Sequence, residues 1–81
     1  MMPQELMEEI EKKEEEILRQ NLEHINYSPF NSLPAYVFIL NNILPENSEL
    51  IKAFSEVGIT DKRIIADHMT HKLAKLKGTA E

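Results

Sequence analysis

The segment Val57-Gly58-Ile59-Thr60-Asp61 constrains the fold of this chain more than any other feature. An apolar helical pattern ends at Val57, and Gly58 can adopt the left-handed backbone conformation that closes a helix. Thr60 can accept hydrogen bonds from the free N–H groups of a new helix, and Asp61 favours the positive end of that helix. The segment therefore predicts a tight corner: one helix stops at Val57, the chain turns at Gly58 and Ile59, and another helix starts at Thr60.

The chain is short and has few ways to stabilise a fold. Its 81 residues predict a single domain, residues 1–81, with a marginal core. There is no cysteine, which excludes disulfides, thiolate zinc sites and cysteine nucleophiles. The two glycines disfavour a Gly-rich phosphate-binding loop. Helix packing or self-association remains, so we expect a homo-oligomer or a subunit of a larger assembly.

Residues 1–25 predict a long acidic amphipathic helix, spanning about 4–25, because Glu, Lys, Leu and Met are strong helix formers. Its apolar residues recur at helical spacing. The stripe is interrupted at Lys13 and Glu14, so we expect the first turns to be exposed, frayed or packed on a partner. We predict a protein-interaction surface on this helix, formed by Leu6, Met7, Ile10, Glu14 and Ile17.

A loop is predicted over residues 26–32, because Pro29 disfavours helical backbone at the residue before it. Asn and Ser, which favour turns, are frequent in this segment. Two aromatic residues, Tyr27 and Phe30, interrupt the polar sequence. We expect both to act as apolar plugs that fix the loop to the core.

The most hydrophobic segment of the chain, residues 33–44, predicts a second helix capped by Ser32 and ended by Pro45. By composition alone, residues 36–40 could instead form a buried strand. The cap, the helical spacing of the apolar residues and the lack of a second strand favour the helix. Because this helix is apolar on almost every side, we expect it to be central and buried.

Two further helices are predicted at the corner, over residues 48–57 and 61–77. Asn47 or Ser48 would cap the first, and Gly78 would close the second. The expected buried face of the last helix is Ile64, Ile65, His68, Met69, Leu73 and Leu76. The predicted fold is thus all-α: a small four-helix bundle with a compact core over 33–78, a central 33–44 helix, a closing 61–77 helix and a loose tail, residues 79–81.

Charge is distributed unevenly along the chain. The net charge of −5 divides into −5 for residues 1–25, −2 for residues 26–58 and +2 for residues 59–81. No stretch reaches the roughly 20 apolar residues of a membrane span, and the N-terminus is acidic. We therefore expect a soluble cytoplasmic protein that does not bind a membrane.

Few residues suggest catalytic or metal chemistry. The histidines are His24, His68 and His71, and the last two are three residues apart on one predicted helix. A metal site would need a third ligand, which His24 could supply only if the first and last helices met. No nucleophile is paired with a base in the sequence. We predict no catalytic residue, metal, cofactor or small-molecule substrate, and hence no enzyme.

Residues 50–76 contain a helix, a glycine turn and a basic helix, which are the parts of a helix-turn-helix motif. The stretch VGITDKRIIADHMTHKL resembles the helix-turn-helix-like segments of phage small terminase-type proteins, and the similarity covers about a third of the chain. The resemblance implies nucleic-acid binding, with phosphate contacts from Lys62, Arg63, Lys72 and Lys75. The acidic balance of the chain and the absence of aromatic residues from the last helix favour instead a plain helical corner with a solvated basic face.

The sequence thus leaves two functions open. The first is a non-enzymatic regulatory or adaptor subunit that acts through protein–protein contacts and self-associates. The alternative is a small helix-turn-helix module for nucleic acid, of phage origin.

Overall fold

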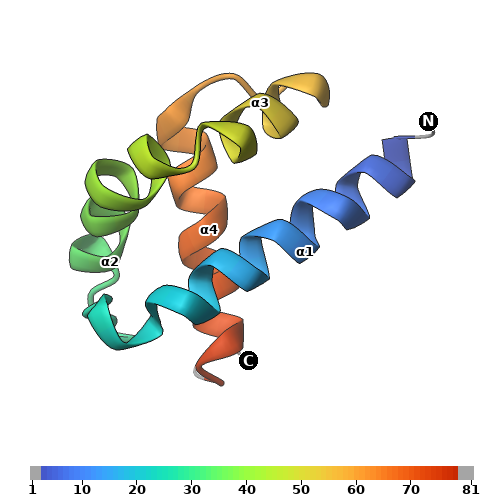
Figure 1. Cartoon of the computed structure of the whole chain (residues 1–81). Coiled ribbons are helices and arrows are strands. Elements are labelled where there is room, and N and C mark those ends of the chain that lie inside the picture. Colours follow the sequence, from blue (N-terminus) through green and yellow to red (C-terminus); the bar gives the residue numbers. More distant parts are fainter. Residues whose placement is uncertain (1–2, 79–81) are drawn as a thin grey trace.

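The computed structural model describes residues 3–78, which form four α-helices in a small bundle (Figure 1). Apart from one isolated bridge, Ser28 to Asn31, these residues contain no β-pairing. The all-α prediction is confirmed, and the strand alternative over 36–40 is wrong. The tail, residues 79–81, lies outside the described residues. The α-helices are α1 (Pro3–Asn21), α2 (Leu33–Phe38), α3 (Ser48–Glu56) and α4 (Lys62–Leu76).

Helix α4 is the centre of the bundle, and it contacts α1, α2 and α3 (Figure 1). Its buried side chains are Ile65, Ala66, Met69, Thr70, Leu73 and Ala74. In α2 only Ala35 is buried, whereas Leu33 and Val37 are exposed. Later in the 33–44 segment Ile39, Ile43 and Leu44 are buried as well, so the segment is buried along one face as expected, but α4 and not this segment is central. Hydrophobic composition marked that segment, but its first turns pack through one face only.

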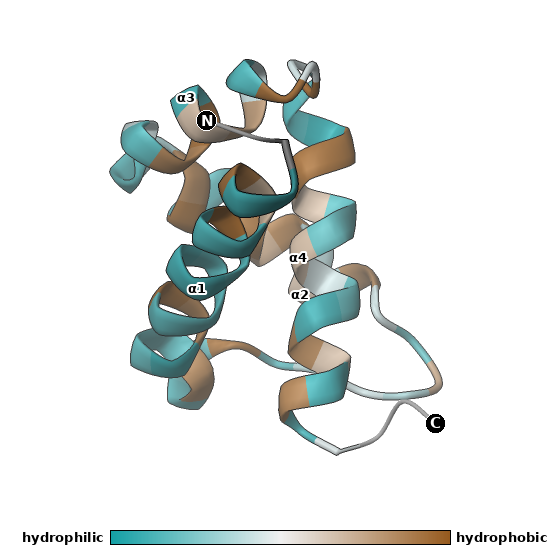
Figure 2. Cartoon of the chain, turned by 90° about the vertical axis from the view of Figure 1, so that its right-hand side faces the viewer, coloured by the Kyte–Doolittle hydropathy of each residue, from teal (hydrophilic) through white to brown (hydrophobic). Residues whose placement is uncertain are grey.

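The buried face of α1 has no gap at the point where the apolar pattern is interrupted, because the side chain of Glu14 is itself buried there. Ile10, Glu14 and Leu18 are spaced by four residues, so they share one helix face, and all three side chains are fully buried. This face packs against α3 and α4. The visible opposite face of α1 is mostly hydrophilic (Figure 2). The expectation of loosely packed first turns is wrong at Ile10.

The 33–44 segment is helical throughout but is not one regular α-helix. After α2 the chain forms a π-helical segment, η2 (Ile39–Ile43), and a 3₁₀ turn, η3 (Leu44–Glu46). The N–H of Leu44 donates to the carbonyl of Ile39, five residues back. Pro45 explains the change, because it has no N–H and its ring clashes with the carbonyl four residues earlier in an α-helix. A wider turn before the proline relieves that clash.

The predicted corner at Gly58 is confirmed. Gly58 has a φ of +88°, and its N–H donates to the carbonyl of Ser55 at 3.0 Å. The N–H of Ile59 donates to the carbonyl of Phe54 at 3.0 Å. These two bonds form the Schellman motif, and Ile59 packs against the core as that motif requires. The last turn of α3 is thus closed by glycine and fixed by a hydrophobic contact.

The start of α4 differs from the prediction by one residue. Asp61, not Thr60, is the N-cap, and its Oδ1 accepts the backbone N–H of Arg63 at 2.9 Å. This hydrogen bond lowers the pKa of the Asp61 carboxyl below its ordinary value of 3.8. Asp competes well with Thr as a cap because its carboxylate also interacts with the positive helix end. Asp61, which was expected only to favour the positive end of the helix, therefore also serves as its N-cap.

Candidate interaction site

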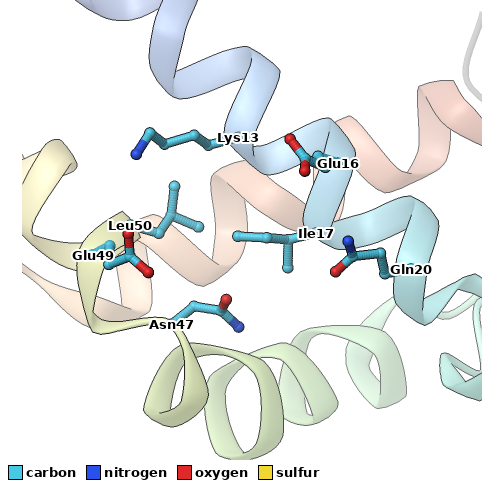
Figure 3. Close-up of a pocket in the computed structure, with 7 residues that line it drawn as sticks. All are labelled: Lys13, Glu16, Ile17, Gln20, Asn47, Glu49 and Leu50. Carbon is cyan, nitrogen blue, oxygen red and sulfur yellow. The ribbon is translucent and has the colours of Figure 1, made fainter.

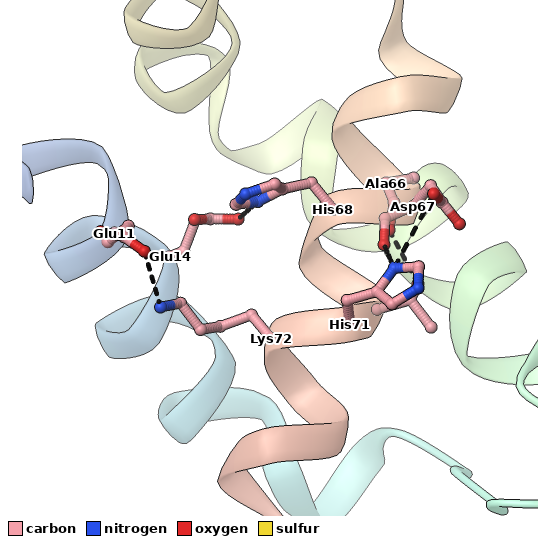
Figure 4. Close-up of polar contacts among 8 residues, drawn as sticks. Glu11, Glu14, Ala66, Asp67, His68, His71 and Lys72 are labelled. Carbon is pink, nitrogen blue, oxygen red and sulfur yellow. Dashed lines mark hydrogen bonds and ion pairs between the residues drawn. The ribbon is translucent and has the colours of Figure 1, made fainter. Parts of the chain in front are cut away.

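A buried polar contact joins α1 to the central helix. Oε2 of Glu14 lies 2.7 Å from Nδ1 of His68, so one proton must lie between the two atoms (Figure 4). Glu14 is fully buried, whereas the side chain of His68 is 38 % exposed. The ring of His68 meets Phe54 edge-on, with ring centroids 5.5 Å apart. The pair therefore sits at the junction of α1, α3 and α4.

The Glu14 carboxyl group is only partly compensated for its burial. Its second oxygen, Oε1, is buried and has no hydrogen-bond partner in the structure. Burial raises the pKa of Glu14 above its ordinary value of 4.5, although the hydrogen bond to His68 opposes the shift. Because no solvent reaches this carboxyl, it cannot contact a substrate in this conformation. It acts between helices.

The other two histidines do not join this pair. Nδ1 of His71 lies 2.9 Å from the carbonyl oxygen of Asp67 on the same helix, and both side chains are exposed. His24 lies in the 3₁₀ turn η1 (Leu22–His24) that follows α1. Within residues 3–78, no group of three His, Asp or Glu side chains could hold a metal ion.

The four candidate nucleic-acid contacts lie on different parts of α4. Nζ of Lys72 is 3.3 Å from Glu11 on α1, and the Lys72 side chain is mostly covered (Figure 4). Arg63 pairs with Asp61 at the start of the helix. Nine residues separate Arg63 from Lys72, which places them on opposite sides of an α-helix. Lys62 and Lys75 are exposed near the two ends. Arg63 and Lys72 therefore do not share a face, and Lys62 and Lys75 lie at opposite ends of α4.

The predicted interaction surface on α1 is divided by the fold. Ile10 and Glu14 are fully buried against the chain's own helices, so neither is accessible. Leu6, Met7 and Ile17 are half-buried and pack at the edge of the core. Helical register accounts for this result, since positions 10, 14 and 18 must point the same way. The residues that remain accessible from this set are Leu6, Met7 and Ile17.

An exposed aromatic residue lies on the loop before α2. Ser28 to Asn31 form a β-turn, in which the N–H of Asn31 donates to the carbonyl of Ser28 at 3.2 Å and Pro29 precedes the tip. The tip residue, Phe30, is 97 % exposed, so the prediction that it plugs the core is wrong. Tyr27 is half-buried and does pack on the core. The hydrogen-bonded turn thus holds Phe30 in solvent.

Two more exposed apolar side chains follow this turn, on α2. Oδ1 of Asn31 accepts the N–H of Leu33 at 3.2 Å, and it replaces the predicted side-chain cap of Ser32, which makes no such bond. Leu33 and Val37 are four residues apart, so they share one face of α2, and they are 60 % and 42 % exposed. We call Phe30, Leu33 and Val37 the apolar strip.

The apolar strip lies within a segment free of charge. Residues 25–45 contain no Asp, Glu, Lys, Arg or His, although the chain carries a net charge of −5. Among the described residues, one other large apolar side chain is strongly exposed, Ile64 at 56 %. Ile64 follows Arg63 and precedes Asp67 on α4, so it lies among charges and was wrongly predicted to face the core. The uncharged sequence segment around it distinguishes the apolar strip from Ile64.

Sequence reasoning missed the exposure of Phe30 and the burial of Glu14, although both have a signal in the sequence. The pattern Ser-Pro-Phe-Asn is typical of a β-turn with proline second, which puts the third side chain at the tip. Glu14 stands four residues after Ile10 and four before Leu18. The helical spacing alone, without regard to the charge of the residue, predicts that Glu14 is buried.

Within residues 3–78, no helix has both the length and the apolar character needed to cross a bilayer. Comparisons with family models, with curated proteins and with solved structures find no significant match.

Proposed function

We propose that this chain is a non-enzymatic protein-interaction module that self-associates through its apolar strip. The observation that carries the proposal is Phe30, a large aromatic side chain held almost entirely in solvent by a hydrogen-bonded turn. Aromatic residues on rigid supports are frequent anchors of protein interfaces. Fully burying a Phe side chain contributes about 1.5–3 kcal/mol, and a two-fold interface buries it twice. That gain is large for so small a surface.

A second copy of the chain is the occupant that the charges favour. Two copies with a net charge of −5 repel each other wherever acidic side chains would meet. Contact through residues 25–45 brings fewer acidic side chains together, because this segment carries no charge of its own. The cores of homodimer interfaces are likewise depleted in charged residues. The apolar strip is therefore suited to a two-fold contact with itself.

The placement of the basic residues gives the nucleic-acid alternative less support. Phosphate-driven binding needs several cations on one surface. Lys72 is paired with Glu11, and Arg63 projects from the opposite side of α4. The Gly58 corner joins two helices that both pack into the core, which explains its presence without a recognition role.

Sedimentation equilibrium tests the proposal with two matched variants. Phe30→Glu introduces a charge at the tip of the turn, where the side chain makes no core contact, and Ile64→Glu makes the same charge change at another exposed position. We expect the wild type and Ile64→Glu to form dimers within about 1 μM to 1 mM, and Phe30→Glu to stay monomeric. A wild type that is monomeric throughout this range contradicts the proposal, and so does equal weakening by both variants.

A further inference from the structure

A groove lies between α1 and α3. It consists of two hollows of about 330 and 300 Å³ (Figure 3 shows the first). The hollows share Lys13 and Glu49, so they adjoin. Along α1 the groove extends from Leu6 to Gln20, which is about 21 Å at the rise of an α-helix. The groove is long enough for about four turns of another helix.

The floor of the groove is apolar. Leu50 and Ile10 are buried at its base, and they mark the points where α3 and α1 meet the core. Leu6, Ile17 and Ala53 are half-buried and line the same space. The contacts open to a partner are those of Leu6, Ile17 and Ala53, because Ile10 and Leu50 are fully covered beneath them.

The rim of the groove is acidic. Four glutamates line it, against two lysines, Lys13 and Lys52, which leaves a net charge of −2. The ion pairs found among residues 3–78 involve other side chains, so the rim carboxylates are available to a partner. The rim glutamates are Glu9 and Glu16 on α1, with Glu49 and Glu56 on α3.

We propose that this groove binds an amphipathic helix of another protein, with Lys or Arg flanking its apolar face. A helix satisfies its own backbone hydrogen bonds, whereas an extended peptide would find no sheet edge to pair with among the described residues. The acidic rim selects basic flanks by charge complementarity. The occupant is not a second copy of this chain, because the basic helix here, α4, already uses its apolar face in the core.

The groove and the apolar strip belong to different elements, α1 and α3 against the turn and α2. Self-association through the strip and helix binding in the groove can therefore occur together. The chain would then present two grooves per dimer to partners, which suits an adaptor. The groove proposal does not depend on dimerisation, and each can fail separately.

Fluorescence anisotropy with designed peptides tests the groove. The probe is a labelled four-turn helix with Leu at positions 1, 4, 8 and 11 and Lys beside them; a matched peptide carries Glu in place of each Lys. We expect saturable binding of the Lys peptide and at least about tenfold weaker binding of the Glu peptide. Equal affinity for both peptides, or no saturable binding of either, overturns the proposal.

Charge-reversal variants locate the binding. Glu16→Lys combined with Glu49→Lys alters two exposed rim positions, and Glu8→Lys combined with Glu23→Lys makes the same charge change outside the groove. We expect the rim variant to bind the Lys peptide at least about tenfold more weakly than the control variant does. Similar losses in both variants overturn the groove as the site, since net charge alone would then explain the binding.

Discussion

Replacing Glu14 with Met should stabilise the chain at neutral pH. The change removes the buried Oε1 that has no partner, whose desolvation costs about 1–3 kcal/mol. It also removes the hydrogen bond to His68, worth about 1 kcal/mol, but His68 is 38 % exposed and can bond to water instead. Met has a similar length and suits a helix. We expect a net gain of up to about 2 kcal/mol in the free energy of unfolding.

The gain from Glu14→Met should shrink in acid. Burial raises the pKa of Glu14 above its ordinary 4.5, so between the two values the folded chain holds a proton that the unfolded chain has lost. The wild type therefore keeps this stability fully below pH 4.5 and loses it as the pH rises through the raised pKa. The variant has no such loss, so its advantage is largest at neutral pH.

Thermal and urea unfolding, followed by circular dichroism at several pH values, measures the effect. A gain of 1 kcal/mol should raise the Tm by about 4–8 °C in a domain of this size. Glu8→Met, at an exposed position of α1, makes the same charge change and should alter stability by less than about 0.5 kcal/mol. Destabilisation by Glu14→Met at neutral pH would refute the reasoning, because the pair with His68 would then outweigh the cost of burial.

Three further predictions concern the corner and the helix beyond it. Gly58→Ala should lower the free energy of unfolding in urea by about 1 kcal/mol, and Gly58→Asn should lower it less. A Cβ at Gly58 meets no atom within 4 Å, so the penalty is that of the positive φ alone. Equal costs for the two variants would point to a clash instead. Asp61→Ala should lower the Tm at neutral pH and Thr60→Ala should leave it nearly unchanged. Since the pKa of Asp61 is lowered, its contribution is present above pH 3.8 and is lost below it, which thermal unfolding across that range checks. Labelled duplex DNA titrated at low salt should show no saturable binding, and a complex that weakens steeply with salt would restore the nucleic-acid alternative.

Features governed by local chemistry were predictable from the sequence. The Gly58 corner depends on one glycine, one capping side chain and the ends of two short patterns, so its position was predicted within one residue. The four helices and the closing Gly78, with a φ of +70°, follow from the same local rules. Even the exchange of Asp61 for Thr60 is a choice between adjacent caps.

Features set by packing between helices were not predictable in the same way. Hydrophobic composition marked 33–44 as the centre, yet burial depends on how many neighbours surround a helix, and α4 has the most. Glu14 was read by its charge, although its register with Ile10 and Leu18 determined its place. Phe30 was assigned to the core because it is apolar, while the turn around Pro29 directs it outward. In each case the prediction followed the residue type, whereas the position of the side chain depends on the geometry of the helix or turn that carries it.

Self-association through the apolar strip is most directly tested by an isotope-filtered nuclear Overhauser experiment on a mixture of labelled and unlabelled chains. We predict intermolecular contacts between the Phe30 ring of one copy and the methyl groups of Leu33 and Val37 of the other. Phe30→Ala should abolish them and weaken dimerisation about 100-fold or more, because two Phe side chains lose burial in each dimer. Intermolecular contacts that instead involve Ile64 or the groove residues, or none at concentrations where the chain is dimeric, would contradict this account.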